Sequence, residues 1–178
     1  MRFIKMHGIG NDYVYINGFD PANAIDDPAA TAVKIADRHF GVGGDGMILV
    51  LPPEAGVEAD VRMRMFNADG SEAEMCGNGI RCVCKLAHDH GITSANPMRI
   101  QTGNGVLTLR YTTNGDGRVE QVTVDMGEPI LEAAKVPVAV PGIAPTATVV
   151  DADGPGDACP GDTAAQAMGA AGVQPTIT

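Results

Sequence analysis

The sequence predicts an α+β fold, in which a curved, mostly antiparallel sheet wraps around one central helix. Many short segments alternate apolar and polar residues as half-buried strands do, for example residues 61–66, where Arg62 and Arg64 interrupt an apolar run. The segment that follows Cys76 instead has helical spacing and is apolar around most of its circumference. Such a helix is usually buried centrally, so the strands would have to surround it.

The expected strands are short and are separated by turn-forming residues. The loop 7–11 holds two glycines and can take unusual backbone angles, and 114–117 has the composition of a hairpin turn. We expect strands at residues 2–6, 12–17, 47–51, 61–66, 98–102, 106–112 and 118–126.

A first helix is expected from Pro28 to about His39. Asp27 is a good N-cap residue, proline is favoured at the first helical position, and Gly41 follows as a stop signal. The apolar residues with helical spacing in this segment are Val33, Ala36 and Phe40.

The central helix is expected to begin after Cys76 and to end near Gly91, because glycine is common just beyond a helix C-terminus. The apolar residues at the i, i+3, i+4 and i+7 positions are Ile80, Val83, Cys84 and Ala87. The narrow polar stripe consists of Arg81, Lys85 and His88. Cys82 and Cys84 are interpreted as packing residues.

Cys76 is the candidate reactive group, because it stands at the first turn of this helix. Helix N-termini carry unpaired N–H groups and a partial positive charge, which stabilise a thiolate and can also hold a carboxylate. A small buried cysteine is the alternative interpretation. Gly77 and Gly79 are poor interior helix formers, so either the close approach of a ligand to the backbone or close helix packing must explain them.

Composition restricts the class of partner. The 178-residue chain has a net charge of −10, which argues against nucleic acid, and no apolar run approaches the length of a membrane span. The N-terminal stretch is too short and too soon interrupted for a signal peptide. We therefore expect a cytoplasmic protein whose four cysteines are reduced thiols.

No metal or nucleotide is expected. Cys76, Cys82 and Cys84 have the spacing C-x5-C-x-C, whereas zinc sites favour C-x2-4-C pairs. The segment 41–46 formally matches G-x-G-x-x-G, but it follows a helix and precedes a strand, the reverse of the dinucleotide-binding context.

A change in composition near Pro141 suggests two parts. We expect an N-terminal domain at residues 1–140. Residues 141–178 contain no aromatic residue, lysine or arginine and are rich in alanine, glycine, proline and aspartate. They are expected to be a linker, with a weak helix at 163–168, that leads to a missing second domain.

Four blocks in order closely resemble the diaminopimelate epimerase family. These blocks are Lys5–Tyr13, Asp37–Gly46, Phe66–Glu72 and Glu74–Cys82. The resemblance implies a half-molecule with a curved sheet around a central helix, one of two similar halves with the substrate between them. It also implies a cofactor-independent isomerase that interconverts LL- and meso-diaminopimelate on the route to lysine and peptidoglycan precursors.

The resemblance assigns roles to five residues. Cys76 would be one of two catalytic thiols, and the substrate contacts would be Asn11, Asn67, Gly77 and Asn78. Two thiols on opposite faces of the α-carbon would remove and deliver the proton. On their residue types alone, Asn11 and Asn67 could also be turn residues.

The chain departs from the family in its second half. Relatives continue with a Gly-Asn-Pro-His segment and a second cysteine in an Ala-Cys-Gly-Thr-Gly motif, and Cys159 does not match that motif. We therefore expect that this chain does not epimerise alone, and that the full-length form could be a homodimer. The alternatives are a PLP-independent racemase or isomerase of another amino acid, and a non-catalytic half-domain that binds a ligand or dimerises.

Overall fold

A single eight-stranded sheet organises the protein in the computed structural model, which describes residues 1–131 and 135. The strands lie in the order β1-β2-β3-β4-β6-β7-β8, and β5 pairs only with β4. The strands are β1 (Ile4–Gly8), β2 (Asn11–Asn17), β3 (Gly46–Leu51), β4 (Val61–Asn67), β5 (Glu72–Ala73), β6 (Met98–Thr102), β7 (Gly105–Thr113) and β8 (Val119–Val124). The helices are the short 3-10 helix η1 (Pro21–Asn23), α1 (Pro28–Ala36) and α2 (Gly77–Asp89).

Most neighbouring strands are antiparallel, as the sequence predicts. The antiparallel pairs are β1–β2, β3–β4, β4–β5, β6–β7 and β7–β8. Two pairs are parallel, β2–β3 and β4–β6, and each is joined by a longer connection, through α1 in one case and α2 in the other. Parallel neighbouring strands need such crossover connections, and α1 and α2 lie in these two connections.

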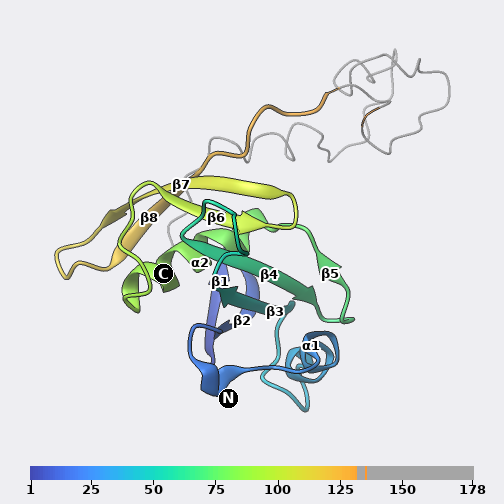
Figure 1. Cartoon of the computed structure of the whole chain (residues 1–178). Helices are drawn as coiled ribbons and strands as arrows, with labels where there is room; N and C mark the ends of the chain where they lie inside the picture. The colour runs from blue at the N-terminus through green and yellow to red at the C-terminus, as the bar shows by residue number, and fades with distance from the viewer. Residues whose placement is uncertain (132–134, 136–178) are drawn as a thin grey trace, which may run out of the picture. The chain divides into compact units, whose positions relative to one another are not determined.

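Helix α2 lies in the middle of the curved sheet and packs against β1, β2, β3, β4, β6, β7 and β8 (Figure 1). Its apolar side chains, among them Ile80 and Leu86, are fully buried in the larger of two hydrophobic clusters. The strands supply alternate residues to this cluster, for example Met63 and Met65 from β4. The predicted arrangement of a sheet around a central helix is confirmed, as is the packing role of Cys82 and Cys84, which have no exposed surface.

Helix α1 covers the other face of the sheet and forms a second, smaller cluster with β2, β3 and β4. Asp27 caps it as predicted, accepting a hydrogen bond from the Ala30 N–H at 2.9 Å. The predicted end near His39 is wrong, because the helix stops at Ala36. The Asp37 carboxylate instead accepts the N–H groups of His39 and Phe40 and turns the chain away.

The apolar side predicted for this first helix is therefore only partly correct. Its buried residues are Ala32, Ile35 and Ala36, whereas Val33 is 46% exposed. Phe40 lies beyond the helix and is 95% exposed. A side chain in an irregular segment does not follow helical spacing, so the match of Phe40 to the pattern was coincidental.

The loop predicted at residues 7–11 is shorter in the structure. β1 continues to Gly8 and β2 begins at Asn11, so only Ile9 and Gly10 form the turn. Both have positive φ, 54° for Ile9 and 80° for Gly10, as in the two-residue turns that suit the twist of a hairpin. The turn places Asn11 at the very start of β2, beside the candidate site described below.

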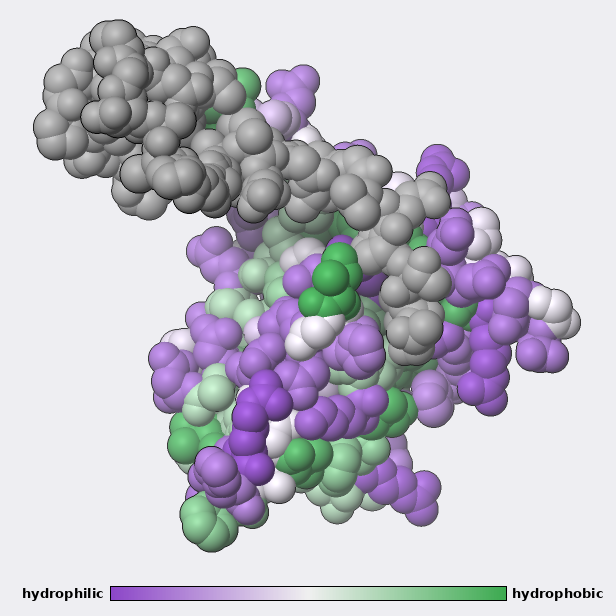
Figure 2. Space-filling model, turned by 180° about the vertical axis from the view of Figure 1, so that it is seen from behind, coloured by the Kyte–Doolittle hydropathy of each residue, from purple (hydrophilic) through white to green (hydrophobic). Residues whose placement is uncertain are grey.

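Figure 2 shows the face opposite to that of Figure 1. Hydrophilic side chains cover much of it, and hydrophobic ones reach the surface chiefly in the lower part of the view, toward the end at which Figure 1 shows α1 and the N-terminus. None of the helices in the part of the chain that the structure describes is both long and apolar enough to cross a membrane. The predicted linker at 141–178, its weak helix at 163–168 and Cys159 lie outside the described residues.

Candidate active site

Cys76 occupies the N-cap position of α2. Its backbone is extended (φ −141°, ψ 115°), and its Sγ accepts a hydrogen bond from the Gly79 N–H at 3.4 Å, where a serine or aspartate oxygen would usually stand. The residue is half-buried, between the packed interior and solvent. An N–H donor and the positive end of a helix both favour negative charge on the sulfur.

The other two thiols of the described chain have a different environment. Burial raises the pKa of Cys82, and burial also raises the pKa of Cys84 to about 12. Because reactivity belongs to the thiolate, both are inert packing residues at neutral pH. Of the three cysteines in the described residues, Cys76 is thus the one whose thiol is not buried.

Asn11 lies directly beside this sulfur, although the two residues are 65 positions apart in the sequence. The thiol of Cys76 donates to the Asn11 Oδ1 at a distance of 3.4 Å from Sγ. Buried Tyr13 adjoins the same pair: burial and the nearby Cys76 raise the pKa of its hydroxyl, and a hydrogen bond with Asn11 partly offsets that increase. Asn11 therefore has contacts across the fold that a simple turn residue would not need.

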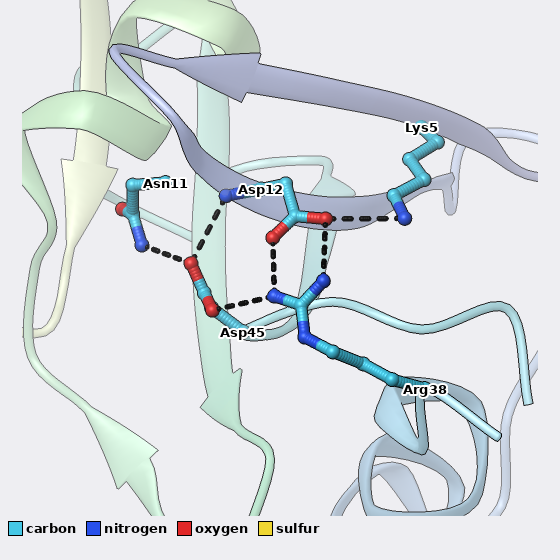
Figure 3. A network of polar contacts seen from close by, with 5 residues as sticks. All are labelled: Lys5, Asn11, Asp12, Arg38 and Asp45. Atoms are coloured by element: carbon cyan, nitrogen blue, oxygen red, sulfur yellow. Dashed lines mark hydrogen bonds and ion pairs between the residues drawn. The ribbon is translucent and has the colours of Figure 1, made fainter.

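A network of charged side chains is hydrogen-bonded to Asn11 (Figure 3). The Asn11 Nδ2 donates to the Asp45 Oδ2 at 2.7 Å, and the Asp12 backbone N–H donates to the same oxygen at 3.0 Å. The guanidinium of Arg38 binds both carboxylates, that of Asp12 at 2.7 Å and that of Asp45 at 2.9 Å. Lys5 adds an ion pair with Asp12 at 3.1 Å. The hydrogen bond from Arg38 is the largest influence holding the pKa of Asp12 below its usual range, with burial opposing it and Lys5 assisting.

Gly77 and Asn78 form the first turn of α2, next to Cys76. Arg81, one turn later, donates to the Gly77 carbonyl at 2.9 Å and to the Asn78 Oδ1 at 2.7 Å. A guanidinium can only donate, so the Asn78 amide must turn its oxygen toward Arg81 and its NH2 group away. The first turn therefore presents N–H donors, which suits a carboxylate ligand.

Close packing accounts for one of the two helix glycines. A Cβ on Gly79 would lie 2.7 Å from the Ile48 Cδ1, so the beginning of α2 packs directly on β3. The end of β1 is equally close, since a Cβ on Gly8 would lie 3.0 Å from the Asn78 carbonyl oxygen. These contacts fix the first turn of α2 against the sheet and thereby fix the position of Cys76.

Asn67 ends β4 and pairs in register with Gly46, the residue after Asp45. Its side chain is engaged locally, donating from Nδ2 to the Ser71 Oγ at 2.9 Å, and its backbone N–H donates to the Ser71 carbonyl at 2.8 Å. The structure therefore shows Asn67 beside the strand end next to Asp45, with its side chain hydrogen-bonded within the turn that follows β4.

Three residues near Cys76 were not predicted from the sequence as parts of the site, namely Arg38, Asp45 and Arg81. Arg38 and Asp45 both lie within the second block of the family resemblance, at residues 37–46, and Arg81 lies within the fourth. The presence of charged residues inside the matched blocks could have indicated that they belong to the site. Their partners could not be chosen, however, because Arg38 and Asp12 are separated by 26 residues and Asp45 and Asn11 by 34.

Comparisons with known proteins show the family of this chain. The family model for diaminopimelate epimerase matches residues 3–132. The chain is 52% identical to the diaminopimelate epimerase of Acetivibrio thermocellus, over 78% of this chain and 47% of the relative. It is 56% identical to that of Desulfovibrio desulfuricans, over 78% of this chain and 46% of the relative. The chain thus spans about half the length of the curated relatives it matches.

A solved structure supports the fold in particular. The crystal structure of methylitaconate-delta-isomerase matches with a TM-score of 0.54 and 17% sequence identity, over 67% of this chain and 36% of that one. At that identity the likeness concerns the arrangement of strands and helices only. The family assignment rests on the much closer sequence matches and on the model that covers most of the described residues. The chain belongs to the diaminopimelate epimerase family.

Proposed function

We propose that this chain forms one half of the active site of a cofactor-independent epimerase that interconverts LL- and meso-diaminopimelate. The observation that carries the proposal is the position of Cys76, a half-buried thiol at a helix N-terminus with the Gly79 N–H on one side and Asn11 on the other. Its neighbours in the chain, Gly77 and Asn78, supply the donors beside it.

The chemistry requires a strong base and a place for negative charge. An α-proton next to a carboxylate is very weakly acidic, so its removal needs a positioned base and stabilisation of the developing carboxylate charge. When Cys76 acts as base, its thiolate takes the proton to form S–H, and the electron pair remains on the substrate as a delocalised carbanion. The N–H groups of the first turn of α2, with the Asn78 amide, are suited to hold the substrate carboxylate.

Inversion then needs a proton delivered to the opposite face of the α-carbon. A second thiol does this by giving up its proton and becoming a thiolate, and the two thiols exchange roles in the reverse reaction. We infer that this second thiol comes from the part of the enzyme that corresponds to the unmatched half of the relatives. Asn67 is proposed as a further substrate contact, from the turn that follows β4.

The remaining features of the proposal follow from the family. We infer an N-terminal domain at residues 1–140, a reaction that needs no bound cofactor, and a cytoplasmic enzyme whose full-length form could be a homodimer. An amino-acid racemase for another substrate and a non-catalytic binding half-domain are the competing outcomes of the test.

The test joins residues 1–140 of this chain to the segment of the Desulfovibrio desulfuricans relative that this chain does not match. Turnover is followed in D2O by proton NMR, as the loss of the α-proton signal of meso-diaminopimelate, with the intact relative as positive control. We expect exchange and epimerisation in the fusion, loss of both in Cys76→Ala, and retention in Cys84→Ser if that variant folds. The 178-residue chain alone is expected to give no epimerisation.

Three results would overturn the proposal. Turnover that persists in Cys76→Ala would remove the thiol from the mechanism. Exchange of proline or hydroxyproline in preference to diaminopimelate, by a fusion that folds, would assign the site to a racemase of another amino acid. A folded fusion that binds diaminopimelate without exchange would leave only the non-catalytic interpretation.

A further inference from the structure

The Asp45 carboxylate lies one residue away from the candidate thiol, on the far side of Asn11. Its Oδ2 atom accepts the Asn11 Nδ2 at 2.7 Å, and the Asn11 Oδ1 in turn faces the Cys76 Sγ at 3.4 Å (Figure 3 shows the first of these contacts). Asn11 begins β2, Asp45 directly precedes β3, and Cys76 is the N-cap of α2. The order carboxylate, amide, thiol therefore depends on the tertiary fold.

The chemistry of the three groups fixes the orientation of the amide. A carboxylate can only accept, so it binds the NH2 end of Asn11 and turns the carbonyl end toward the sulfur. A carbonyl oxygen can only accept as well, so it interacts favourably with a protonated thiol and unfavourably with a thiolate. If the amide were reversed, its NH2 group would donate to the sulfur and favour the thiolate.

Arg38 holds Asp45 in this position. Its Nη2 binds the Asp45 Oδ1 at 2.9 Å, which leaves the Oδ2 free for Asn11, and it also binds the Asp12 Oδ1 at 2.7 Å. The Asp12 backbone N–H is the second donor to the Asp45 Oδ2. Both oxygens of Asp45 thus have defined hydrogen-bond partners, and these partners fix the orientation of the carboxylate.

We propose that Asp45 is a positioning residue for Cys76, and that it acts by locking the Asn11 amide with its carbonyl oxygen toward the sulfur. This lock biases Cys76 toward its protonated, proton-donating form, against the Gly79 N–H and the helix N-terminus, which favour the thiolate. The catalytic meaning rests on the proposed function, because a two-thiol epimerase needs one thiol protonated and one deprotonated at the start of each turnover.

Other titratable groups near the sulfur cannot provide this bias through charge at neutral pH. Burial raises the pKa of Tyr13, Tyr15 and Cys82, so all three are uncharged there. Arg81 is a cation on α2 itself; its two Nη atoms bind the Gly77 carbonyl and the Asn78 Oδ1, and its buried Nε has no hydrogen-bond partner in the described structure. The nearby carboxylates are Asp12 on β2 and Asp45 just before β3; Arg38 pairs with both, and Lys5 adds a second cation at Asp12.

The experiment measures the alkylation of Cys76 in the 178-residue chain. Iodoacetamide modification is quantified by peptide mass spectrometry between pH 5 and 9, and the pH at which the rate is half-maximal is the readout. Asp45→Ala removes the acceptor, whereas Asp45→Asn keeps an oxygen that can still bind the Asn11 NH2 group. We expect the midpoint to fall by about one pH unit in Asp45→Ala and by clearly less in Asp45→Asn.

The same two substitutions in an Asn11→Ala background isolate the amide. Once the amide is gone, Asp45→Ala and Asp45→Asn should shift the midpoint equally, because each then removes only the negative charge. Asn11→Ala alone should lower the midpoint, since it removes the acceptor that faces the sulfur. This single variant keeps the proposal testable if Asp45→Ala fails to fold, which far-UV circular dichroism would reveal.

Equal shifts for Asp45→Ala and Asp45→Asn in the protein that retains Asn11 would overturn the proposal, and so would a midpoint that rises or stays constant in Asn11→Ala. Asp116→Asn, in the exposed β7–β8 turn, is the matched carboxylate-to-amide control and should leave the midpoint unchanged. No substrate is present in this measurement. The alkylation result therefore does not depend on whether the protein is an epimerase, and a failure of the positioning role of Asp45 can be distinguished from a failure of the proposed function.

Discussion

Asp89 ties the end of the central helix to the last strand of the sheet, and we predict that neutralising it weakens the fold. Its side chain is only 8% exposed and accepts the Val119 N–H at 2.9 Å. It also pairs with the Lys85 Nζ at 3.0 Å and the His88 Nδ1 at 3.1 Å. Lys85 in turn donates to the Val119 carbonyl, so the helix and β8 are joined at both backbone groups of one residue.

The cost of Asp89→Asn can be worked out from these contacts. The amide oxygen can still accept the Val119 N–H, but the ion pair with Lys85 is lost and an NH2 group faces the ammonium. Hydrogen bonds to charged groups contribute about 1.5–3 kcal/mol and neutral ones about 1 kcal/mol. We therefore expect the free energy of unfolding to fall by about 2 kcal/mol, which corresponds to a drop in Tm of about 4–8 °C for a chain of this size.

The pH dependence gives an independent check. Burial by itself would raise the pKa of Asp89, but the hydrogen bonds from Val119, Lys85 and His88 outweigh it and hold the pKa below its usual range. A carboxyl with a lowered pKa in the folded state stabilises the fold above its unfolded value of about 3.9, and this stabilisation is lost as the pH falls through the folded value. The difference between wild type and Asp89→Asn should therefore shrink in acid.

Urea denaturation of both proteins at pH 7 and again near pH 3 tests this reasoning. Glu120→Gln, on the exposed side of β8, is the matched control and should change stability by less than about 0.5 kcal/mol. A difference below about 0.5 kcal/mol between wild type and Asp89→Asn at pH 7 would refute the argument, and so would a difference that is undiminished at pH 3.

Three further predictions concern the core and the site. Ile80→Ala should lower the free energy of unfolding by about 2–5 kcal/mol in urea denaturation, because the side chain is fully buried and its removal leaves a cavity; a loss under 1 kcal/mol would contradict this. In the fusion enzyme, Arg81→Met should raise KM for diaminopimelate about tenfold by releasing the Asn78 amide; an unchanged KM would show that Arg81 does not position it. At pH 8, iodoacetamide should modify Cys76 at least about tenfold faster than Cys84, whose thiol is buried with a pKa of about 12; comparable rates by peptide mapping would refute the distinction.

Local features of the fold could be predicted from the sequence because their causes are local. Alternating apolar residues placed β4, and the pair Asp27-Pro28 placed the beginning of α1, because capping and burial patterns involve neighbours in the chain. The end of α1 was predicted incorrectly, since the Asp37 carboxylate takes the N–H groups of His39 and Phe40 and ends the helix earlier. The two-residue strand β5 is too short to leave a periodic signal.

The candidate site was predictable only in part. Cys76 was identified from its place at a helix start, and the structure shows that N-cap position together with Asn11 beside the sulfur. The roles of Asn11, Asn67, Gly77 and Asn78 toward a substrate stay predictions. Asp45 has no local signature, because its partner Asn11 lies on another strand.

The α+β class, the helix that carries the thiol and the family were all predictable from the sequence, because periodicity, caps and ordered motifs lie within short segments. Which of those segments contact one another depends on the tertiary fold. The parallel pairing of β2 with β3 brings Asn11 and Asp45 to neighbouring strand ends, and the close packing of Gly79 on Ile48 sets the start of α2 beside them. The orientation of an amide between a carboxylate and a thiol depends on groups far apart in the chain, so only the folded protein determines it.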